Sequence, residues 1–228
     1  MPSELEQLFP RDALDRIAEA VRRAEKNTRG EIVPYVVPRS DRYPESIWRA
    51  AAIGITISLL ILGTLPLVTS LWLPFGAAMT AVIAIGAGIL LGLIVTLAPA
   101  LQPLIAGRMA VRHRVAQRAA EAFIAEEVFA TRDRSGILIF LSLLERRVIV
   151  LGDSGINAVI APEEWNGIVD KIVAGIRSRR GADGLIEAIG ECGRLLKERG
   201  FEIAPDDLNE LPDTLRFGGE TGGSDALS

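Results

Sequence analysis

Between Ala50 and Gly107 the chain contains no Asp, Glu, Lys, Arg or His. All 29 acidic and 25 basic residues therefore lie in the two flanks, although 49% of the whole sequence is apolar. Crossing a hydrocarbon core of roughly 30 Å takes about 20 apolar residues in a helix, so this stretch is long enough for two crossings. We place the two spans at about 50–70 and 78–99, with a reversal between them at 70–76 that contains a proline, a glycine and two aromatic residues. A single soluble hydrophobic core is the less favoured alternative, because a helix in a soluble protein keeps a polar face.

Basic residues on both sides of the apolar stretch predict its orientation. They are Arg39, Arg42 and Arg49 before the first span and Arg108, Arg112, Arg114 and Arg118 after the second. The segment between the spans has none, and Lys and Arg accumulate on the cytoplasmic side of membrane helices. The first residues include Glu4 and Glu6 and no apolar run, so they do not predict a secretory signal peptide. We therefore expect a multi-pass protein of the inner (plasma) membrane with both termini in the cytoplasm.

The chain has one cysteine, Cys192, and one histidine, His113. These numbers exclude an intrachain disulfide and a zinc site made of four cysteine or histidine ligands, in agreement with a reducing compartment. Cys192 lies on the apolar face of its expected helix, which predicts a packed thiol rather than a nucleophile. The formal net charge is −4, and only the short basic run after the second span would favour nucleic acid, so we expect no nucleic-acid binding.

Each flank has the pattern of an α/β domain. Before the spans, apolar residues at helical spacing predict a helix at 11–29, and a strand follows at 31–37, in which Pro34 indicates a sheet edge or a bulge because it lacks an N–H. After the spans we expect a helix to about 130, strands at 136–143 and 147–151, and helices at about 162–176 and 183–199. A two-stranded hairpin is marginal alone, so the two flanks are expected to complete one sheet.

This organisation divides the chain into four segments. The first part of the α/β domain is 1–49, the transmembrane hairpin is 50–101, the second part of the domain is 102–200, and the tail is 201–228. An even number of crossings returns the chain to the side that it left, which allows one domain to be built from both flanks. The tail is acidic and rich in Gly and Pro, and we expect it to be disordered.

Three segments give the chain a resemblance to a known family. They are 28–33 (TRGEIV), 134–142 (RSGILIFLS) and 145–150 (ERRVIV). In these segments and in their spacing the chain resembles the TPM domain family, which includes thylakoid lumen proteins linked to photosystem II repair and many bacterial membrane proteins. The resemblance covers most of both flanks. It implies a three-layer α/β/α sandwich of TPM type, here interrupted by the two-helix transmembrane hairpin.

The resemblance also bears on function. Some relatives are described as acid phosphatases or as binding divalent cations through aspartates, one near the start of the domain and one after the last strand. At those places this chain has Arg11 and Ala13, and Ala161 and Pro162. We therefore expect a non-enzymatic, membrane-anchored interaction module in the assembly or quality control of membrane proteins, with a membrane protein as its partner. A divalent-metal-dependent phosphatase is the alternative.

One loop has the composition of a catalytic site. The sequence GDSG at 152–155 is similar to a serine-nucleophile loop, but that chemistry needs a base and an orienting acid, and the only histidine lies in the basic run near the membrane. We therefore predict a turn after a strand, with no catalytic residue and no cofactor. If a divalent cation binds, Asp153 and Glu31 are the candidate ligands, although a hard cation needs several oxygen ligands.

Two further patterns concern the membrane. Arg108, Arg112, His113 and Arg114 are candidates to bind anionic lipid headgroups, and they also fit a simple role in setting topology; the two roles are compatible. Small residues four apart, including Gly54 in the first span and Gly88 and Gly92 in the second, allow close helix contact. The expected use is packing of the two spans on each other, and a homodimer through Gly88 and Gly92 is the alternative.

Overall fold

The structure, a computed structural model, describes residues 4–68, 76–178, 180–202 and 210–219. By its internal contacts the chain forms two compact units. The first, which we call the α/β unit, combines Met1–Asp41 with Arg114–Ser228. The second, which we call the helical unit, is Arg42–His113.

A four-stranded sheet in the order β3-β2-β1-β4 organises the α/β unit. Its strands are β1 (Glu31–Val37), β2 (Gly136–Ser142), β3 (Arg147–Gly152) and β4 (Arg216–Phe217). The strand β1 pairs in parallel with β2 from Glu31↔Gly136 to Val37↔Ser142, and β2 pairs with β3 in the antiparallel direction. The expected pairing between strands from the two flanks is therefore observed.

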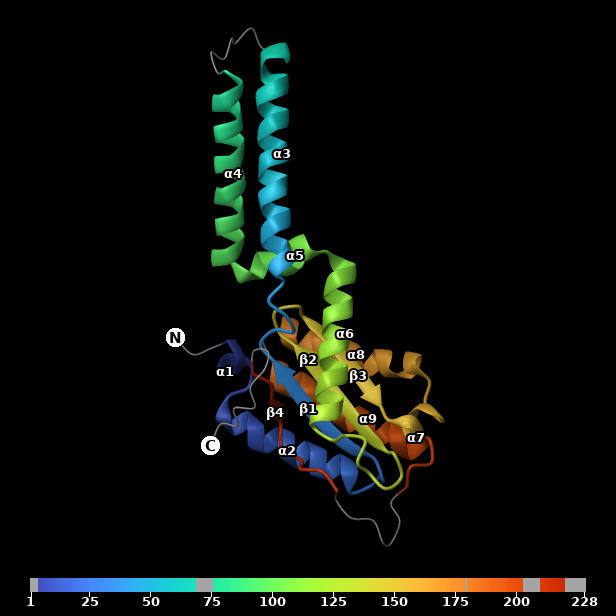
Figure 1. The fold of residues 1–228 in the computed structure, drawn as a ribbon. Coiled ribbons are helices and arrows are strands. Elements are labelled where there is room, and N and C mark those ends of the chain that lie inside the picture. The colour runs from blue at the N-terminus through green and yellow to red at the C-terminus, as the bar shows by residue number, and fades with distance from the viewer. Residues whose placement is uncertain (1–3, 69–75, 179, 203–209, 220–228) are drawn as a thin grey trace. The chain divides into compact units, whose positions relative to one another are not determined.

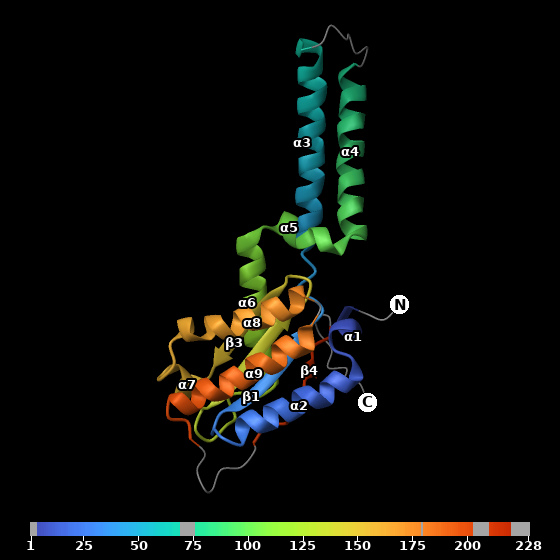
Figure 2. The same ribbon diagram turned by 180° about the vertical axis from the view of Figure 1, so that it is seen from behind.

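Helices cover both faces of this sheet (Figures 1 and 2). On one face lie α2 (Arg11–Glu25), α8 (Asn166–Arg177) and α9 (Gly181–Glu198), and on the other lies α6 (Arg108–Ala125). All residues of β1 and β2 are buried, which is why both strands are apolar on both faces. The aromatic pair Tyr35 and Phe140, on neighbouring strands, stacks at 5.9 Å between ring centroids.

The contact between α8 and α9 depends on two glycines. A Cβ built on Gly175 would lie 2.7 Å from the Cα of Gly184, and one built on Gly184 would lie 2.8 Å from the Cα of Gly175. Real Cβ atoms do not approach other atoms so closely, so both positions need glycine. This close packing lets α8 and α9 share one face of the sheet.

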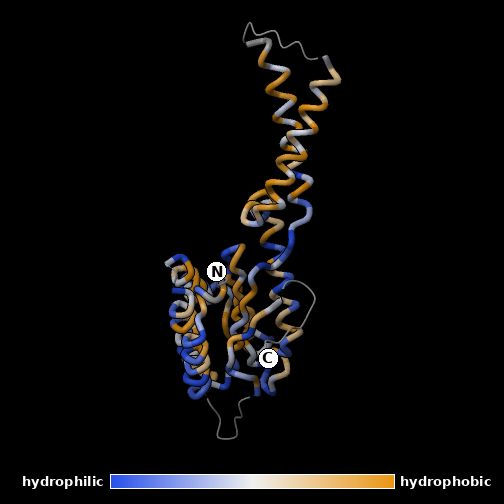
Figure 3. The backbone as a smooth tube through the Cα atoms, turned by 90° about the vertical axis from the view of Figure 1, so that its left-hand side faces the viewer, coloured by the Kyte–Doolittle hydropathy of each residue, from blue (hydrophilic) through white to orange (hydrophobic). Residues whose placement is uncertain are grey.

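The helical unit consists of two long helices and a short connection. The long helices are α3 (Pro44–Val68) and α4 (Ala77–Leu97), followed by a 3-10 turn at Pro99–Leu101 and by α5 (Gln102–Ala106). Both α3 and α4 are long and apolar enough to cross a membrane. Figure 3 shows that hydrophobic residues run along almost their whole length. The reversal expected at 70–76 lies almost wholly outside the described residues.

Several expected boundaries differ from those observed. The helix expected at 11–29 ends at Glu25, and three short helices had no clear signal, namely α1 (Glu4–Leu8), α5 and α7 (Ser154–Asn157). The expectation of disorder at 201–228 is wrong for residues 210–219, because β4 pairs there with Tyr35 and Val36. This short ladder was missed because two residues carry no periodicity.

The strand β1 is consequently not an edge strand along its whole length. Val36 accepts a hydrogen bond from the N–H of Gly218, so the backbone groups of Val36, and by strand alternation those of Pro34, face the β4 side. Pro34 lies before the two-residue ladder begins. Its missing N–H therefore removes no hydrogen bond from the sheet, which is the physical reason that proline is tolerated there.

The burial of Phe140 leads to a stability prediction. Phe140 is fully buried and stacks on Tyr35, so Phe140→Ala should lower the free energy of unfolding by roughly 3 to 5 kcal/mol. The measurement is urea denaturation of the detergent-solubilised chain, followed by Trp165 fluorescence in a Trp48→Phe/Trp72→Phe background. Ile124→Ala, at a position of α6 that is 65% exposed, is the control and should change stability by less than about 0.5 kcal/mol. Equal effects of the two alanine substitutions would contradict the assigned core.

Candidate functional site

Polar contacts fix the α/β unit at the point where the chain leaves it. The N–H of Ser40 donates to Glu145 Oε1 at 3.0 Å, the hydroxyls of Ser40 and Ser142 are 2.7 Å apart, and the Ser142 hydroxyl also donates to Glu145. Next to them, Arg114 Nε and Asp41 Oδ2 form an ion pair at 3.0 Å. Asp41 and Arg114 are the residues at which the chain leaves and re-enters this unit, so the ion pair holds the two crossing points together.

The two candidate metal ligands lie at the same end of the sheet but make separate contacts. Glu31 opens β1, and its carboxylate accepts hydrogen bonds from the backbone N–H groups of Glu210 and Leu211, both at 3.2 Å. Asp153 follows β3, two strands away, which corresponds to roughly 10 Å between backbones. Its Oδ1 accepts from the N–H of Ser154 at 2.6 Å as the N-cap of α7.

The structure therefore does not bring Glu31 and Asp153 to one site. In the part of the chain that the structure describes, no three Asp, Glu, His or Cys side chains are grouped so that they could hold a metal ion. Asp153 Oδ2 lies 3.5 Å from a guanidinium nitrogen of Arg134, a cation that would compete with a metal ion. Cation binding and phosphatase activity stay untested hypotheses.

A group of carboxyls at the start of β1 was not recognised in the sequence. Burial raises the pKa of Glu25 to about 9, against a hydrogen bond from the N–H of Ile32, and the nearby carboxyls of Glu31 and Asp213 add to the effect. Burial also raises the pKa of Glu31, where the two backbone N–H donors act in the opposite direction. The partners come from segments almost 190 positions apart, and no local pattern signals such an arrangement.

The candidate lipid-binding residues lie in the first turns of α6. Arg108, Arg112, His113 and Arg114 are all exposed. Arg108 and Arg112 are one turn apart and share a helix face. Of the four, Arg114 is engaged by Asp41. The exposure of Arg108, Arg112 and His113 is compatible with contact to lipid headgroups, which stays a prediction.

Ser154 and Cys192 both have structural environments. Ser154 is the first residue of α7, and its N–H is held by Asp153, as expected for a turn after a strand. Cys192 is fully buried, and burial raises the pKa of its thiol to about 12. A thiol of that kind is not ionised near neutral pH, so the expectation of a packed cysteine is confirmed.

The small residues of the long helices lie in the contact between α3 and α4. A Cβ on Gly54 would lie 2.9 Å from the carbonyl oxygen of Ala87, and a Cβ on Gly88 would lie 2.9 Å from that of Ala51. Gly92 faces the same neighbour, with Ile47 and Ala51 within 4 Å. The packing of the two helices on each other is therefore observed. A homodimer through Gly88 and Gly92 would need this surface and stays a prediction.

Together these features define a class of protein: a mixed α/β protein with one four-stranded sheet and two additional helices long and apolar enough to cross a membrane. Among solved structures, the chain is similar to the BA42 protein of the psychrophilic bacterium Bizionia argentinensis, determined by NMR. The TM-score is 0.54 at 20% sequence identity, over 91% of this chain and 93% of that chain. At this identity the likeness concerns the fold alone. No family model matches the chain, and no curated protein matches it.

The raised pKa of Glu25 predicts a dependence of stability on pH. The folded protein keeps this proton up to pH about 9, whereas the unfolded chain loses it above the ordinary value of 4.5. The contribution is therefore fully present below pH 4.5 and is lost as the pH rises toward 9, with a slope of at most about 1.4 kcal/mol per pH unit. Glu25→Gln keeps an oxygen acceptor for the N–H of Ile32 but cannot ionise, so it should flatten the slope.

Denaturation of both proteins between pH 5 and 9, again followed by Trp165 fluorescence, measures this effect. Glu19→Gln, which changes an exposed carboxylate on the same helix, is the matched control and should leave the slope unchanged. If the wild-type stability rose over this pH range and the rise were absent from Glu25→Gln, the assigned protonation would be contradicted.

Proposed function

We propose that this chain is a membrane-anchored interaction module of the TPM type, inserted in the inner membrane by a helical hairpin, with both termini in the cytoplasm. In this proposal the α/β unit contacts other membrane proteins during their assembly or quality control, and it does so without catalysis. The resemblance of the segments around 28–33, 134–142 and 145–150 supports the family, and the similarity to BA42 supports the fold.

One observation carries the membrane part of the proposal: the apolar side chains of α3 and α4 are mostly exposed. Only 11% of the most apolar part of α3 and 22% of that of α4 is buried within the chain. Ile57, Leu60, Val82 and Ile89 are each at least half exposed. In water such a surface would be strongly unfavourable and prone to aggregation, whereas lipid tails cover it at no such cost.

Threonine hydroxyls within these helices are satisfied inside the helix, as a bilayer requires. The hydroxyls of Thr56, Thr64 and Thr96 donate to the carbonyl oxygens of Ala52, Leu60 and Gly92, four residues earlier. Each of these hydroxyls would cost free energy in hydrocarbon without a partner. The pattern is compatible with a lipid environment, and the exposed apolar side chains carry the argument for it.

Residues at the ends of the helical unit support the orientation. Trp48, in the first turns of α3, is 78% exposed, and tryptophan is enriched at the level of lipid headgroups. Arg49 donates to the carbonyl oxygens of Ile105 and Ala106, the last residues of α5. This contact joins the two ends of the unit that carry arginines, and arginines mark the cytoplasmic side.

The chemistry of the described residues supports binding over catalysis. The thiol of Cys192 is buried, the Ser154 loop has no histidine near it in the sequence, and the carboxyls of Glu31 and Asp153 are each held by backbone N–H groups. A nucleophile would need an adjacent base, and a hydrolytic metal site would need grouped ligands. An interaction surface needs neither.

Crosslinking in native membranes tests the interaction. The three lysines, Lys26, Lys171 and Lys197, all lie in the α/β unit, so an amine-reactive crosslinker with mass spectrometry should link them repeatedly to cytoplasmic segments of integral membrane proteins. Replacing all three with Arg keeps the charge and should remove these links, which is the control. Links to soluble proteins alone would contradict the proposal. So would Mg²⁺-dependent turnover of a phosphomonoester that Asp153→Ala abolishes.

A further inference from the structure

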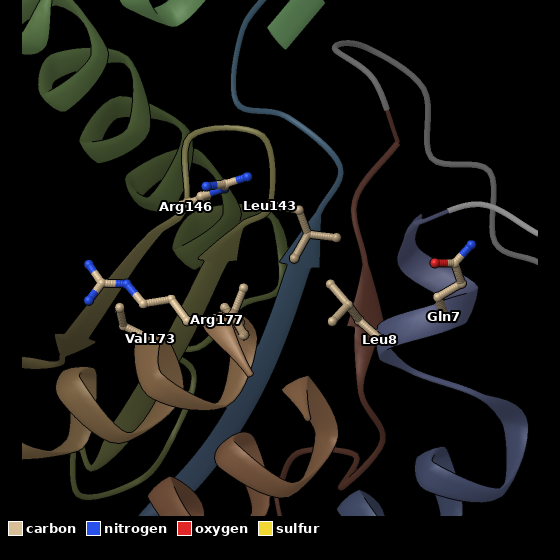
Figure 4. Close-up of a pocket in the computed structure, with 7 residues that line it drawn as sticks. Gln7, Leu8, Leu143, Arg146, Val173 and Arg177 are labelled. Atoms are coloured by element: carbon tan, nitrogen blue, oxygen red, sulfur yellow. The ribbon is translucent and has the colours of Figure 1, made fainter. Parts of the chain in front are cut away.

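A cavity of about 610 Å³ opens at one end of the α/β unit (Figure 4). It lies between α1, the turn that joins β2 to β3, and the last turns of α8. Its lining is Gln7, Leu8, Leu143, Arg146, Val173, Ile176 and Arg177. This volume falls within the range of sites that hold small organic ligands.

The lining has an apolar part and a cationic part. Leu8 and Leu143 are buried and point toward each other across the cavity, and Val173 and Ile176 are half-buried beside them. Arg146 and Arg177 are exposed and lie on the side opposite to Leu8. The cavity therefore offers apolar contact next to two positive charges.

Among the described side chains, no anion competes for the two arginines. Neither forms an ion pair among the described residues, and no acidic residue of the described chain lines the cavity. Glu145, the neighbour of Arg146 in sequence, is occupied by Ser40 and Ser142. Arg146 has a positive φ of 51°, a conformation that is uncommon for residues other than glycine and that fixes the turn from which its side chain extends.

The position of the cavity in the chain points to the source of its ligand. The N–H groups of Leu143 and Leu144 donate to the carbonyl oxygens of Val37 and Pro38, so the β2–β3 turn lies at the end of the sheet where β1 ends. From there the chain continues through Asp41 into the helical unit. The cavity is thus at the end of the sheet from which the chain leaves toward the apolar helices.

We propose that this cavity binds an anionic membrane lipid. The phosphate of the headgroup pairs with Arg146 and Arg177, and the first part of the acyl chains lies on Leu8, Leu143, Val173 and Ile176. Free phosphate and soluble fatty acids share parts of this chemistry, and the experiment below distinguishes them from a membrane lipid. This lipid site goes beyond the proposed contact with membrane proteins. Of the proposed function, it rests only on the attachment of the chain to the membrane.

The test is titration of the detergent-purified full chain with phosphatidylglycerol or phosphatidylcholine, with bound lipids counted by native mass spectrometry. Phosphatidylglycerol should bind more tightly than phosphatidylcholine. Arg146→Gln/Arg177→Gln should weaken phosphatidylglycerol binding roughly 10- to 30-fold, as expected from two basic residues at a lipid phosphate. Val173→Phe, which fills part of the cavity and leaves both charges, should weaken it as well.

The matched control is Lys26→Gln/Lys197→Gln. It removes the same charge at two exposed lysines near the start of β1, the opposite end of the sheet, and should leave binding unchanged. Trp165 fluorescence of each variant, measured in the Trp48→Phe/Trp72→Phe background, verifies that the α/β unit is folded.

Three results would overturn the proposal. The first is equal binding of the two lipids, and the second is unchanged phosphatidylglycerol binding in the folded Arg146→Gln/Arg177→Gln protein. The third is displacement of phosphatidylglycerol by millimolar inorganic phosphate or by a soluble fatty acid, since either would assign the site to a soluble ligand. If the second result is found together with loss of binding in Arg108→Gln/Arg112→Gln, the lipid contact is assigned to α6. A failure here leaves the crosslinks to membrane proteins unaffected, so the two proposals are tested separately.

Discussion

The parallel ladder between β1 and β2 is the interaction on which the α/β unit depends. It pairs Glu31 with Gly136, 105 positions later, and both strands are buried on both faces. Closing so long a loop costs conformational entropy, and the contact between α3 and α4 reduces this cost because it brings the ends of the intervening segment together. The ion pair between Asp41 and Arg114 also holds the two ends of this intervening segment together. Without β1, the remaining β2–β3 hairpin would be marginal.

The elements that could be predicted are those with a strong local pattern. The continuous apolar runs of β1 and β2 and the uncharged stretch from Ala50 to Gly107 each specify a structure within a short window. The strand β4 could not be predicted, because its two residues are stabilised by Tyr35 and Val36, which are far away in sequence. The short helix α7 depends in the same way on a single cap, Asp153.

Sites made of residues from distant segments were also missed. Asp153 and Glu31 were chosen because they were acids near strand ends, and the sheet places them two strands apart. Glu25 was not chosen, although its protonation follows directly from burial beside Glu31 and Asp213. Which side chains share a site depends on strand order, and one sequence does not specify strand order between distant segments. Packed residues such as Cys192, whose environment is set by its own helix, were predicted correctly.

Carboxyls and arginines with different environments lie at the two ends of β1. The carboxyls of Glu25 and Glu31 lie where β1 begins, whereas Arg114 and Arg146 lie where it ends and the chain continues toward the helical unit. An anionic bilayer surface attracts basic residues and repels acidic ones. The arginine-bearing end of β1 is therefore the end that the proposed anchoring and the proposed lipid cavity both use.

The most direct test of this account is cysteine labelling in intact cells. In a Cys192→Ser background, single cysteines replace Lys26 in the first flank, Ser70 between the spans and Lys197 in the second flank, and an impermeant maleimide is added before or after permeabilisation. The account predicts labelling of the Ser70 site from outside, and labelling of the Lys26 and Lys197 sites only after permeabilisation. Labelling of the Lys26 and Lys197 sites from opposite sides of the membrane would contradict it, because β1 and β2 could then not form one sheet.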